Sequence, residues 1–340
     1  MNRTGVVTHP IYLQHDAGPY HPECPERLEA IHAMLETTGL AGSLQSVEAR
    51  EATDEEICRT HSPDYYRHVA ASEGRCVALD PDTHTSPDSF RAALMAAGGA
   101  LVLTEQVVAG ELDNGFALVR PPGHHAERAQ ARGFCLFNNI AVCAEHALQA
   151  LGLSRVAILD WDLHHGNGTM HSFWKRPDVL YLSTHQYPFY PGTGALRDVG
   201  QGEGEGFTVS VPLPTGMGDQ EYAAIFRDLL SPIVLAYKPE LLLVSAGFDT
   251  LSSDPLGGMR MSPEGYGTLM AQVMRMAGGA GKVVVLLEGG YDVRREAEGV
   301  EQVLRVLRGE LVPDPVADGQ GLAGPIIEGV RLVQAPYWTF

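Results

Sequence analysis

Short apolar runs alternate with longer amphipathic segments over most of this 340-residue chain. The runs have the length of strands, and the segments between them have the length and periodicity of helices. We predict strands at 116–119, 156–160, 179–183, 207–211, 241–245 and 283–287, and helices at about 25–37, 88–109, 138–151, 219–236, 262–277 and 292–308. Strands that alternate with helices form a mostly parallel sheet with helices on both faces, so the sequence predicts an α/β fold.

The alternation ends near residue 309, and we expect residues 1–309 to form a single domain. From about residue 310 the chain is rich in Pro, Gly and Asp. We expect residues 310–340 to be a tail that either packs on the domain or is loosely ordered.

The charge balance and the cysteines restrict the class of protein. The 42 acidic residues outnumber the 24 basic ones, for a formal net charge of −18, which argues against nucleic-acid binding and suits a cationic substrate better. The N-terminus lacks the pattern of a signal peptide, and we expect no apolar run that approaches the length of a membrane span. The five cysteines show no Cys-x-x-Cys spacing, so we expect reduced thiols and a cytoplasmic protein.

Three potential metal ligands lie at the end of the predicted strand 156–160. Asp160, Asp162 and His164 are spaced two residues apart, and alternate side chains of an extended segment point to the same side. Such groups are costly to bury without a partner, and two carboxylates with one imidazole suit zinc or a similar ion. The alternative interpretation is a helix cap with a surface histidine.

Other reactive residues also follow predicted strands, and in a parallel sheet these strand ends meet at one edge. His124 and His125 follow a rigid Pro-Pro-Gly segment and could be metal ligands or a general base with an electrostatic partner. Asp249 could be a helix N-cap or a third ligand. Tyr291, after two glycines, could be a core residue or could place its hydroxyl beside a metal. Phe134 could belong to an aromatic core cluster or line a narrow channel.

Taken together, these segments resemble the histone deacetylase superfamily, from His9-Pro10 and the loop 21–28 through about residue 309. The segment from Asp80 to Thr83 and the segment 287–291 resemble the class II branch and its bacterial amidohydrolases. Asn167 does so too, because class I enzymes have Asp there. The resemblance implies an arginase-like three-layer α/β fold and a zinc-dependent enzyme that removes an acetyl or other acyl group from the Nε of lysine.

The resemblance also implies roles for the catalytic residues. Asp162, His164 and Asp249 would bind zinc, with positions left open for water and the substrate carbonyl. His125 would be the general base, and His124, paired with Asp160, would assist it electrostatically. Asn167 would hold His125 and leave it less basic than an Asp would. Tyr291 would donate a hydrogen bond to the developing oxyanion.

Further residues would shape the substrate channel and bind potassium. Phe134, Gly133 and Tyr190 would form the channel, with Leu256 and Asp82 near its rim, and Arg27 would lie near the foot of the pocket. A potassium ion would bind through Asp160, Asp162, His164, Ser183 and Thr184, and a second through backbone carbonyls near Phe173, Val179 and Phe207.

Three other functions compete with lysine deacylation. An acetylpolyamine amidohydrolase would be expected to carry an acidic gatekeeper where this chain has Leu256, although Asp80 and Asp82 could still orient an amine. A dimanganese ureohydrolase would need a further Asp two residues after Asp249, where this chain has Leu251. A non-catalytic protein that binds an acylated ligand is the third alternative. The protein would act on an acylated lysine or an acetylated small amine, without nucleic acid or membrane.

Overall fold

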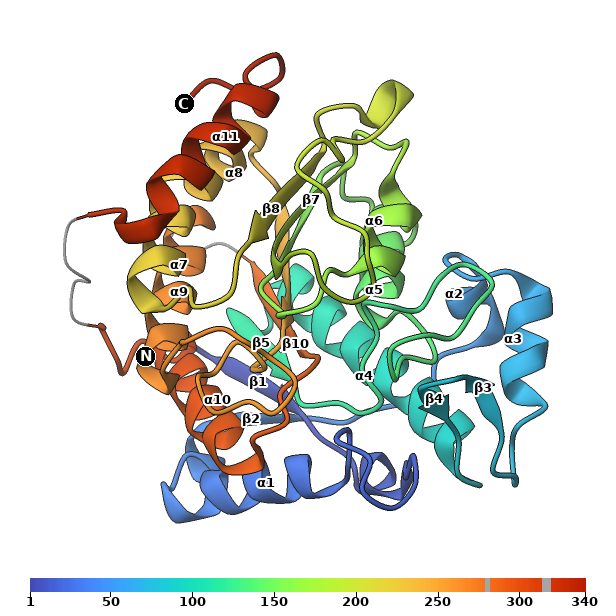
Figure 1. Cartoon of the computed structure of the whole chain (residues 1–340). Coiled ribbons are helices and arrows are strands. Elements are labelled where there is room, and N and C mark those ends of the chain that lie inside the picture. Colours follow the sequence, from blue (N-terminus) through green and yellow to red (C-terminus); the bar gives the residue numbers. More distant parts are fainter. Residues whose placement is uncertain (279–281, 314–318) are drawn as a thin grey trace.

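A parallel eight-stranded sheet runs through the centre of the computed structural model, which describes residues 1–278, 282–313 and 319–340 (Figure 1). Within these residues the strand order is β2-β1-β5-β10-β9-β6-β7-β8. The strands are β1 (Thr4–Val7), β2 (Gln45–Val47), β5 (Asn114–Ala117), β6 (Val156–Asp160), β7 (Val179–Gln186), β8 (Thr208–Leu213), β9 (Leu241–Ala246) and β10 (Val283–Leu287). A separate hairpin pairs β3 (Ala78–Asp80) with β4 (Thr83–His84) in antiparallel fashion.

Helices cover both faces of the sheet, as the predicted α/β fold requires (Figure 1). On one face α10 contacts both α1 and α9, and on the other α5 contacts both α4 and α6. The helices are α1 (Glu26–Thr37), α2 (Asp54–Cys58), α3 (Pro63–Ala70), α4 (Ser89–Ala109), α5 (Asn139–Gln149), α6 (Asn167–Phe173), α7 (Asp219–Ile225), α8 (Ser231–Tyr237), α9 (Pro263–Met276), α10 (Val293–Leu307) and α11 (Gly324–Gln334). The three-layer α/β architecture predicted from the sequence is confirmed.

All six predicted strands and six predicted helices are present, with bounds that shift by a few residues. The predicted helix 219–236 divides into α7, a π-helical segment Phe226–Leu230 and α8. Pro232 directly follows the start of α8 and cannot donate to the carbonyl oxygen of Asp228, four residues earlier, which accepts from the Arg331 guanidinium at 2.7 Å instead. The prediction missed β1, β2, β3, β4, α2, α3, α6 and α11. All but α11 are too short to show a clear period. Helix α11 lies in the segment that was expected to be a tail because of its Pro, Gly and Asp.

Helix α4 corrects one expectation. By length and composition it is apolar enough to cross a membrane, so the expectation that no run approaches that length is wrong. Its small residues explain the composition, because they allow close packing inside the protein. A Cβ atom at Gly98 would lie only 2.0 Å from the carbonyl oxygen of Arg50, and 67% of the apolar window is buried.

The C-terminal segment places a helix on the edge of the sheet. Helix α11 contacts β8, with Ile327 and Val330 buried, and the Gln334 side chain donates to the carbonyl oxygen of Thr208 at 2.9 Å. Beyond the helix, the Trp338 indole donates to the carbonyl oxygen of Gly206 at 2.8 Å. Of the expected tail, residues 314–318 lie outside the described residues, while residues 324–338 pack on the sheet.

Candidate active site

The three predicted zinc ligands come together beyond the carboxyl ends of β6 and β9, which are neighbouring strands. One potential ligand atom from each of Asp162, His164 and Asp249 lies within 4.8 Å of the others, and all three residues are buried. His164 Nδ1 lies 2.9 Å from Asp249 Oδ2 and 3.3 Å from Asp162 Oδ1. Backbone N–H groups of Leu163 and Gly289 donate to the two carboxylates and fix their orientation.

The electrostatics of this cluster fit a bound divalent cation. Burial and the negative charge of Asp162 raise the pKa of Asp249 to about 7. Despite its burial, the neighbouring histidines hold the pKa of Asp162 below its ordinary value, so a charged Asp162 lies beside a buried Asp249 whose own charge the site disfavours. A cation ligated by both would remove this cost, and the donor set of two carboxylates and one imidazole suits zinc.

His124 and His125 lie side by side, with ring centroids 4.0 Å apart, yet they have different partners. The Nδ1 atom of His124 is 3.1 Å from Asp160 Oδ2, and that of His125 is 2.8 Å from Asn167 Oδ1. Burial disfavours the charge on His124, but Asp162 and Asp160 raise its pKa to about 10. Burial and the positive charge of His124 hold the pKa of His125 well below its ordinary value. A charged and a neutral imidazole are thus available at the same place.

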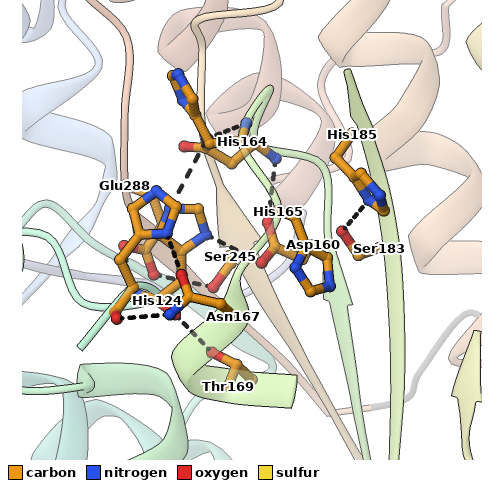
Figure 2. A network of polar contacts seen from close by, with 12 residues as sticks. His124, Asp160, His164, His165, Asn167, Thr169, Ser183, His185, Ser245 and Glu288 are labelled. Atoms are coloured by element: carbon orange, nitrogen blue, oxygen red, sulfur yellow. Dashed lines mark hydrogen bonds and ion pairs between the residues drawn. The ribbon is translucent and has the colours of Figure 1, made fainter. Parts of the chain in front are cut away.

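The loop that carries these histidines is held by Glu288, a residue to which the sequence analysis gave no role. Its carboxylate accepts from the backbone N–H groups of Gly123 at 2.7 Å and His124 at 3.1 Å, and from Ser245 Oγ at 2.9 Å (Figure 2). Glu288 directly follows the apolar strand β10. That position was the available signal, because a buried carboxylate at a strand end needs donors.

A pocket of about 230 Å³ leads to the cluster. It is lined by Asp82, His125, Gly133, Phe134, His164, Phe189, Tyr190, Leu256 and Tyr291. All five residues predicted for the channel are therefore on its wall. Phe189 was missed, although it stacks on His164 with ring centroids 5.6 Å apart. Its place in the aromatic and proline-rich segment 187–191 was the only signal.

The backbone at Gly133 and Phe134 shapes one side of the pocket. Both residues have positive φ, +55° and +69°. A Cβ atom at Gly133 would lie 2.4 Å from His125 Cδ2, so glycine allows the loop to approach the histidine. The Phe134 ring meets Tyr291 edge-on at 5.9 Å, and Tyr190 meets His125 in the same way at 5.2 Å.

Two contacts hold Tyr291 in place, one to its backbone N–H group and one to the face of its ring. Its N–H donates to Asp254 Oδ2 at 2.7 Å, and the Arg27 guanidinium lies 5.3 Å from the ring centroid. Burial and the charge of Asp249 raise the pKa of Tyr291 well above its ordinary value, so its hydroxyl keeps its proton and can donate. Arg27 itself is fully buried and donates to the carbonyl oxygens of Glu288 and Gly290, both at 2.6 Å. It lies behind Tyr291 and not on the pocket wall.

Of the residues expected to bind potassium, Asp162 and His164 belong to the ligand cluster, while Ser183 and Thr184 lie on β7, the strand next to β6. Asp160 and Ser183 are register partners on β6 and β7, and Tyr181 donates its hydroxyl to Asp160 at 3.0 Å. Ser183 Oγ is 2.9 Å from His185 Nδ1 (Figure 2), and Thr184 Oγ1 is buried without a hydrogen-bond partner among the described residues. Of the second set, Phe173 ends α6, Val179 begins β7 and Phe207 directly precedes β8.

Comparison with known proteins adds independent evidence. A family model described as the histone deacetylase domain matches residues 21–307. The polyamine deacetylase HDAC10 of Mus musculus is 41% identical over 341 residues, which cover 93% of this chain and 50% of HDAC10. A probable deacetylase of Archaeoglobus fulgidus is 40% identical over 294 residues, or 85% of this chain and 82% of its own length.

A solved structure shows the same fold. The crystal structure of the HDA15 HD domain superimposes with a TM-score of 0.92 at 39% identity and covers 99% of this chain and 95% of that chain. This chain spans about half the length of the HDAC10 protein that it matches. With a family model over most of its length and a 40%-identical relative that it largely spans, this chain belongs to the histone deacetylase family.

Proposed function

We propose that this protein is a zinc-dependent amidohydrolase that removes an acetyl or other acyl group from the Nε of lysine. The observation that carries the proposal is a narrow pocket with His125 and Tyr291 on its wall and His164 of the ligand cluster among its lining residues. The relatives named above are called deacetylases, which supports the same reaction class.

One zinc ion per chain would be held by Asp162, His164 and Asp249. When bound, it would polarise the amide carbonyl and lower the pKa of a water molecule. The residues of this chain would do the rest of the chemistry. His125, neutral and tied through Nδ1, has Nε2 free to take a proton from the attacking water and deliver it to the leaving amine.

Two further groups would stabilise charge in the transition state. His124, paired with Asp160, would supply a nearby positive charge. The Tyr291 hydroxyl would donate to the oxyanion that forms from the carbonyl. Asn167 would hold His125 in place through its amide oxygen.

We propose acyl-lysine as the main substrate because the pocket wall combines the aromatic rings of Phe134, Phe189 and Tyr190 with the apolar Leu256. These groups suit the aliphatic chain of lysine. An acetylpolyamine is the second candidate. It is favoured by Asp82 on the pocket wall, which could attract a second amine, and by the 41% identity to a polyamine deacetylase.

Several supporting roles complete the proposal. Potassium would bind near Asp160, Ser183 and Thr184, where a buried hydroxyl has no partner among the described residues. A second potassium would use carbonyl groups near Phe173, Val179 and Phe207. Arg27 would support the foot of the pocket, and residues 1–309 would constitute the catalytic domain. A dimanganese site is disfavoured because Leu251 stands where a further ligand is needed, and the filled catalytic positions disfavour a mere binding protein.

The proposal is tested by the hydrolysis of an acetyl-lysine peptide, measured on protein as isolated, after chelation and after zinc is restored. We expect turnover that is lost with the chelator and recovered with zinc. Parallel assays with longer acyl groups and an acetylated polyamine rank the substrates. Protein that binds one zinc per chain and turns over only the polyamine would shift the function to the second candidate. Protein that binds no metal would overturn the ligand assignment.

A further inference from the structure

Asn167 holds the proposed general base, and its own orientation depends on a residue that no motif points to. The Asn167 amide nitrogen lies 2.5 Å from Glu127 Oε1 and 3.2 Å from the carbonyl oxygen of His125. Both atoms accept hydrogen bonds, so the amide nitrogen must face them. The amide oxygen must then face His125, whose Nδ1 lies 2.8 Å away.

The direction of these bonds determines where the proton of His125 resides. An amide oxygen can only accept, so Nδ1 of His125 must carry the hydrogen. In a neutral imidazole the other nitrogen, Nε2, is then free to accept. A base that takes a proton from water needs this tautomer, and the opposite tautomer would present an N–H group to the water.

Glu127 is the stronger of the two acceptors that orient Asn167. Its carboxylate is an acceptor with both oxygens, and its hydrogen bond is charge-assisted and shorter than the one to the His125 carbonyl. The position of Glu127 is itself fixed. Its backbone carbonyl accepts from His61 Nδ1 at 2.8 Å, and its backbone N–H donates to Gln130 at 2.9 Å. On the solvent side its carboxylate accepts from His171 Nδ1 at 2.8 Å.

We propose that Glu127 is a positioning residue of the deacylase reaction: by orienting the Asn167 amide it holds His125 in the tautomer that can act as a base. The inference rests on the proposed function, in which His125 is that base. Glu127 does not line the substrate pocket and acts only through Asn167.

The test first removes the Glu127 acceptor and then replaces Asn167 by a residue that needs no acceptor to orient it. Glu127→Met keeps similar length and volume but replaces the carboxylate by a thioether, which is at most a weak acceptor, and Glu127→Gln keeps a neutral oxygen acceptor. Asn167→Asp places a carboxylate beside His125. A carboxylate accepts with either oxygen and needs no neighbour to orient it. The two positions therefore form a double-mutant cycle.

We expect Glu127→Met to lower kcat about tenfold or more, with KM within about threefold. The wrong tautomer of His125 cannot accept the proton, so the chemical step slows while substrate binding is unaffected. Glu127→Gln should retain most of the turnover. In the Asn167→Asp background, Glu127→Met should cost less than about twofold. An equal cost in both backgrounds, or no cost beside Asn167, would overturn the inference.

A matched control and a spectroscopic measurement separate this role from a structural one. Glu127 and Glu145 line the same small surface cavity, but the Glu145 carboxylate pairs with Arg176. Glu145→Met therefore makes the same change away from Asn167 and should retain turnover. Nitrogen NMR of ¹⁵N-histidine-labelled, zinc-loaded protein reports the tautomer of His125 directly. We expect the Nδ1–H tautomer in the parent and a raised share of Nε2–H in Glu127→Met. An unchanged tautomer would refute the inference even if the parent protein hydrolysed no acyl-lysine.

Discussion

At the scale of single residues, partners decide what identical side chains can do. His124 and His125 are adjacent in the chain and similarly buried, but one faces carboxylates and the other an amide oxygen. Asp162 and Asp160 therefore raise the pKa of His124, whereas burial lowers the pKa of His125. Such a pair suits the roles proposed above, with His124 as the charge stabiliser and His125 as the base.

Tyr291→Phe tests the oxyanion donor. The ring and its contact with Phe134 stay, and only the hydroxyl is lost. We expect kcat to fall about a hundredfold, because a preorganised donor to an oxyanion contributes on the order of 3 kcal/mol. Zinc content, measured by metal analysis, should be unchanged. Undiminished turnover in Tyr291→Phe would contradict the assignment.

His61 should make the protein less stable at mildly acidic pH. It is buried, with Nδ1–H donating to the carbonyl oxygen of Glu127 and Nε2 accepting from the N–H of Asn138 at 2.9 Å. Burial lowers the pKa of His61 to about 4, below that of an unfolded histidine. The unfolded chain therefore takes up the proton first. The contribution to stability is complete above about pH 6.5 and is lost as the pH falls toward 4.

The measurement is the free energy of unfolding by denaturant between pH 7 and pH 4, for the parent and for His61→Ala. We expect the parent to lose on the order of 3 kcal/mol more than the variant over this range. Subtracting the variant removes the contributions of other buried histidines, such as His185. Parallel pH curves for the two proteins would show that His61 is not the source.

At the scale of elements, the loop that carries His124 and His125 is held by the ends of two strands. The Glu288 carboxylate at the end of β10 joins the loop residues Gly123 and His124 to Ser245 of β9. These hydrogen bonds tie the loop to the sheet and restrain its position, although the loop has no regular structure of its own. Active-site geometry is often supported by such groups outside the pocket.

Glu288→Ala should disturb both stability and turnover. It leaves two buried N–H groups without an acceptor, at a cost of about 1–3 kcal/mol for each, and lets the histidines move. Glu288→Gln keeps an oxygen for these N–H groups and can donate to Ser245, so both the free energy of unfolding and kcat should stay close to the parent. Ser245→Ala is the control for loss of the third bond alone. If the Ala and Gln variants behave alike, Glu288 does not hold the loop.

At the scale of the whole molecule, the parallel sheet collects reactive side chains from distant parts of the chain. β5, β10, β9 and β6 are consecutive in the sheet, and the loops after them carry His125, Tyr291, Asp249 and Asp162. Strand ends of one direction meet at one edge, so four loops converge on one pocket. This convergence buries several carboxylates together, so the binding of the proposed metal would be coupled to stability.

Metal removal should therefore lower the thermal stability of the protein. A metal that binds only the folded state at a thousand times its dissociation constant adds about 4 kcal/mol. We expect the unfolding temperature in calorimetry to fall after chelation and to return with zinc. In Asp249→Asn, which removes one ligand and one buried charge, the difference between chelated and zinc-treated protein should be much smaller. An equal difference in both proteins would place the stabilising metal elsewhere.

From the sequence alone, six strands of the central sheet, the long helices between them and the reactive residues at the strand ends could be predicted. Apolar runs of strand length and helical periodicity are local properties, and alternate residues of an extended segment share one side, so Asp160, Asp162 and His164 could be grouped without a structure. The resemblance of the motifs was enough to indicate the family. Phe134 and Tyr190 could be assigned to the channel by the same route.

The side chains that support these residues became visible only once the chain was folded. The order of strands in the sheet, with β10 between β5 and β9, is not written in any local pattern. Glu288 holds a loop 165 positions earlier in the chain, Glu127 meets Asn167 across 40 positions, and Phe189 reaches His164 from a separate loop. Hydrogen bonds and ring contacts depend on distance in space, which the separation of two residues along the chain does not indicate.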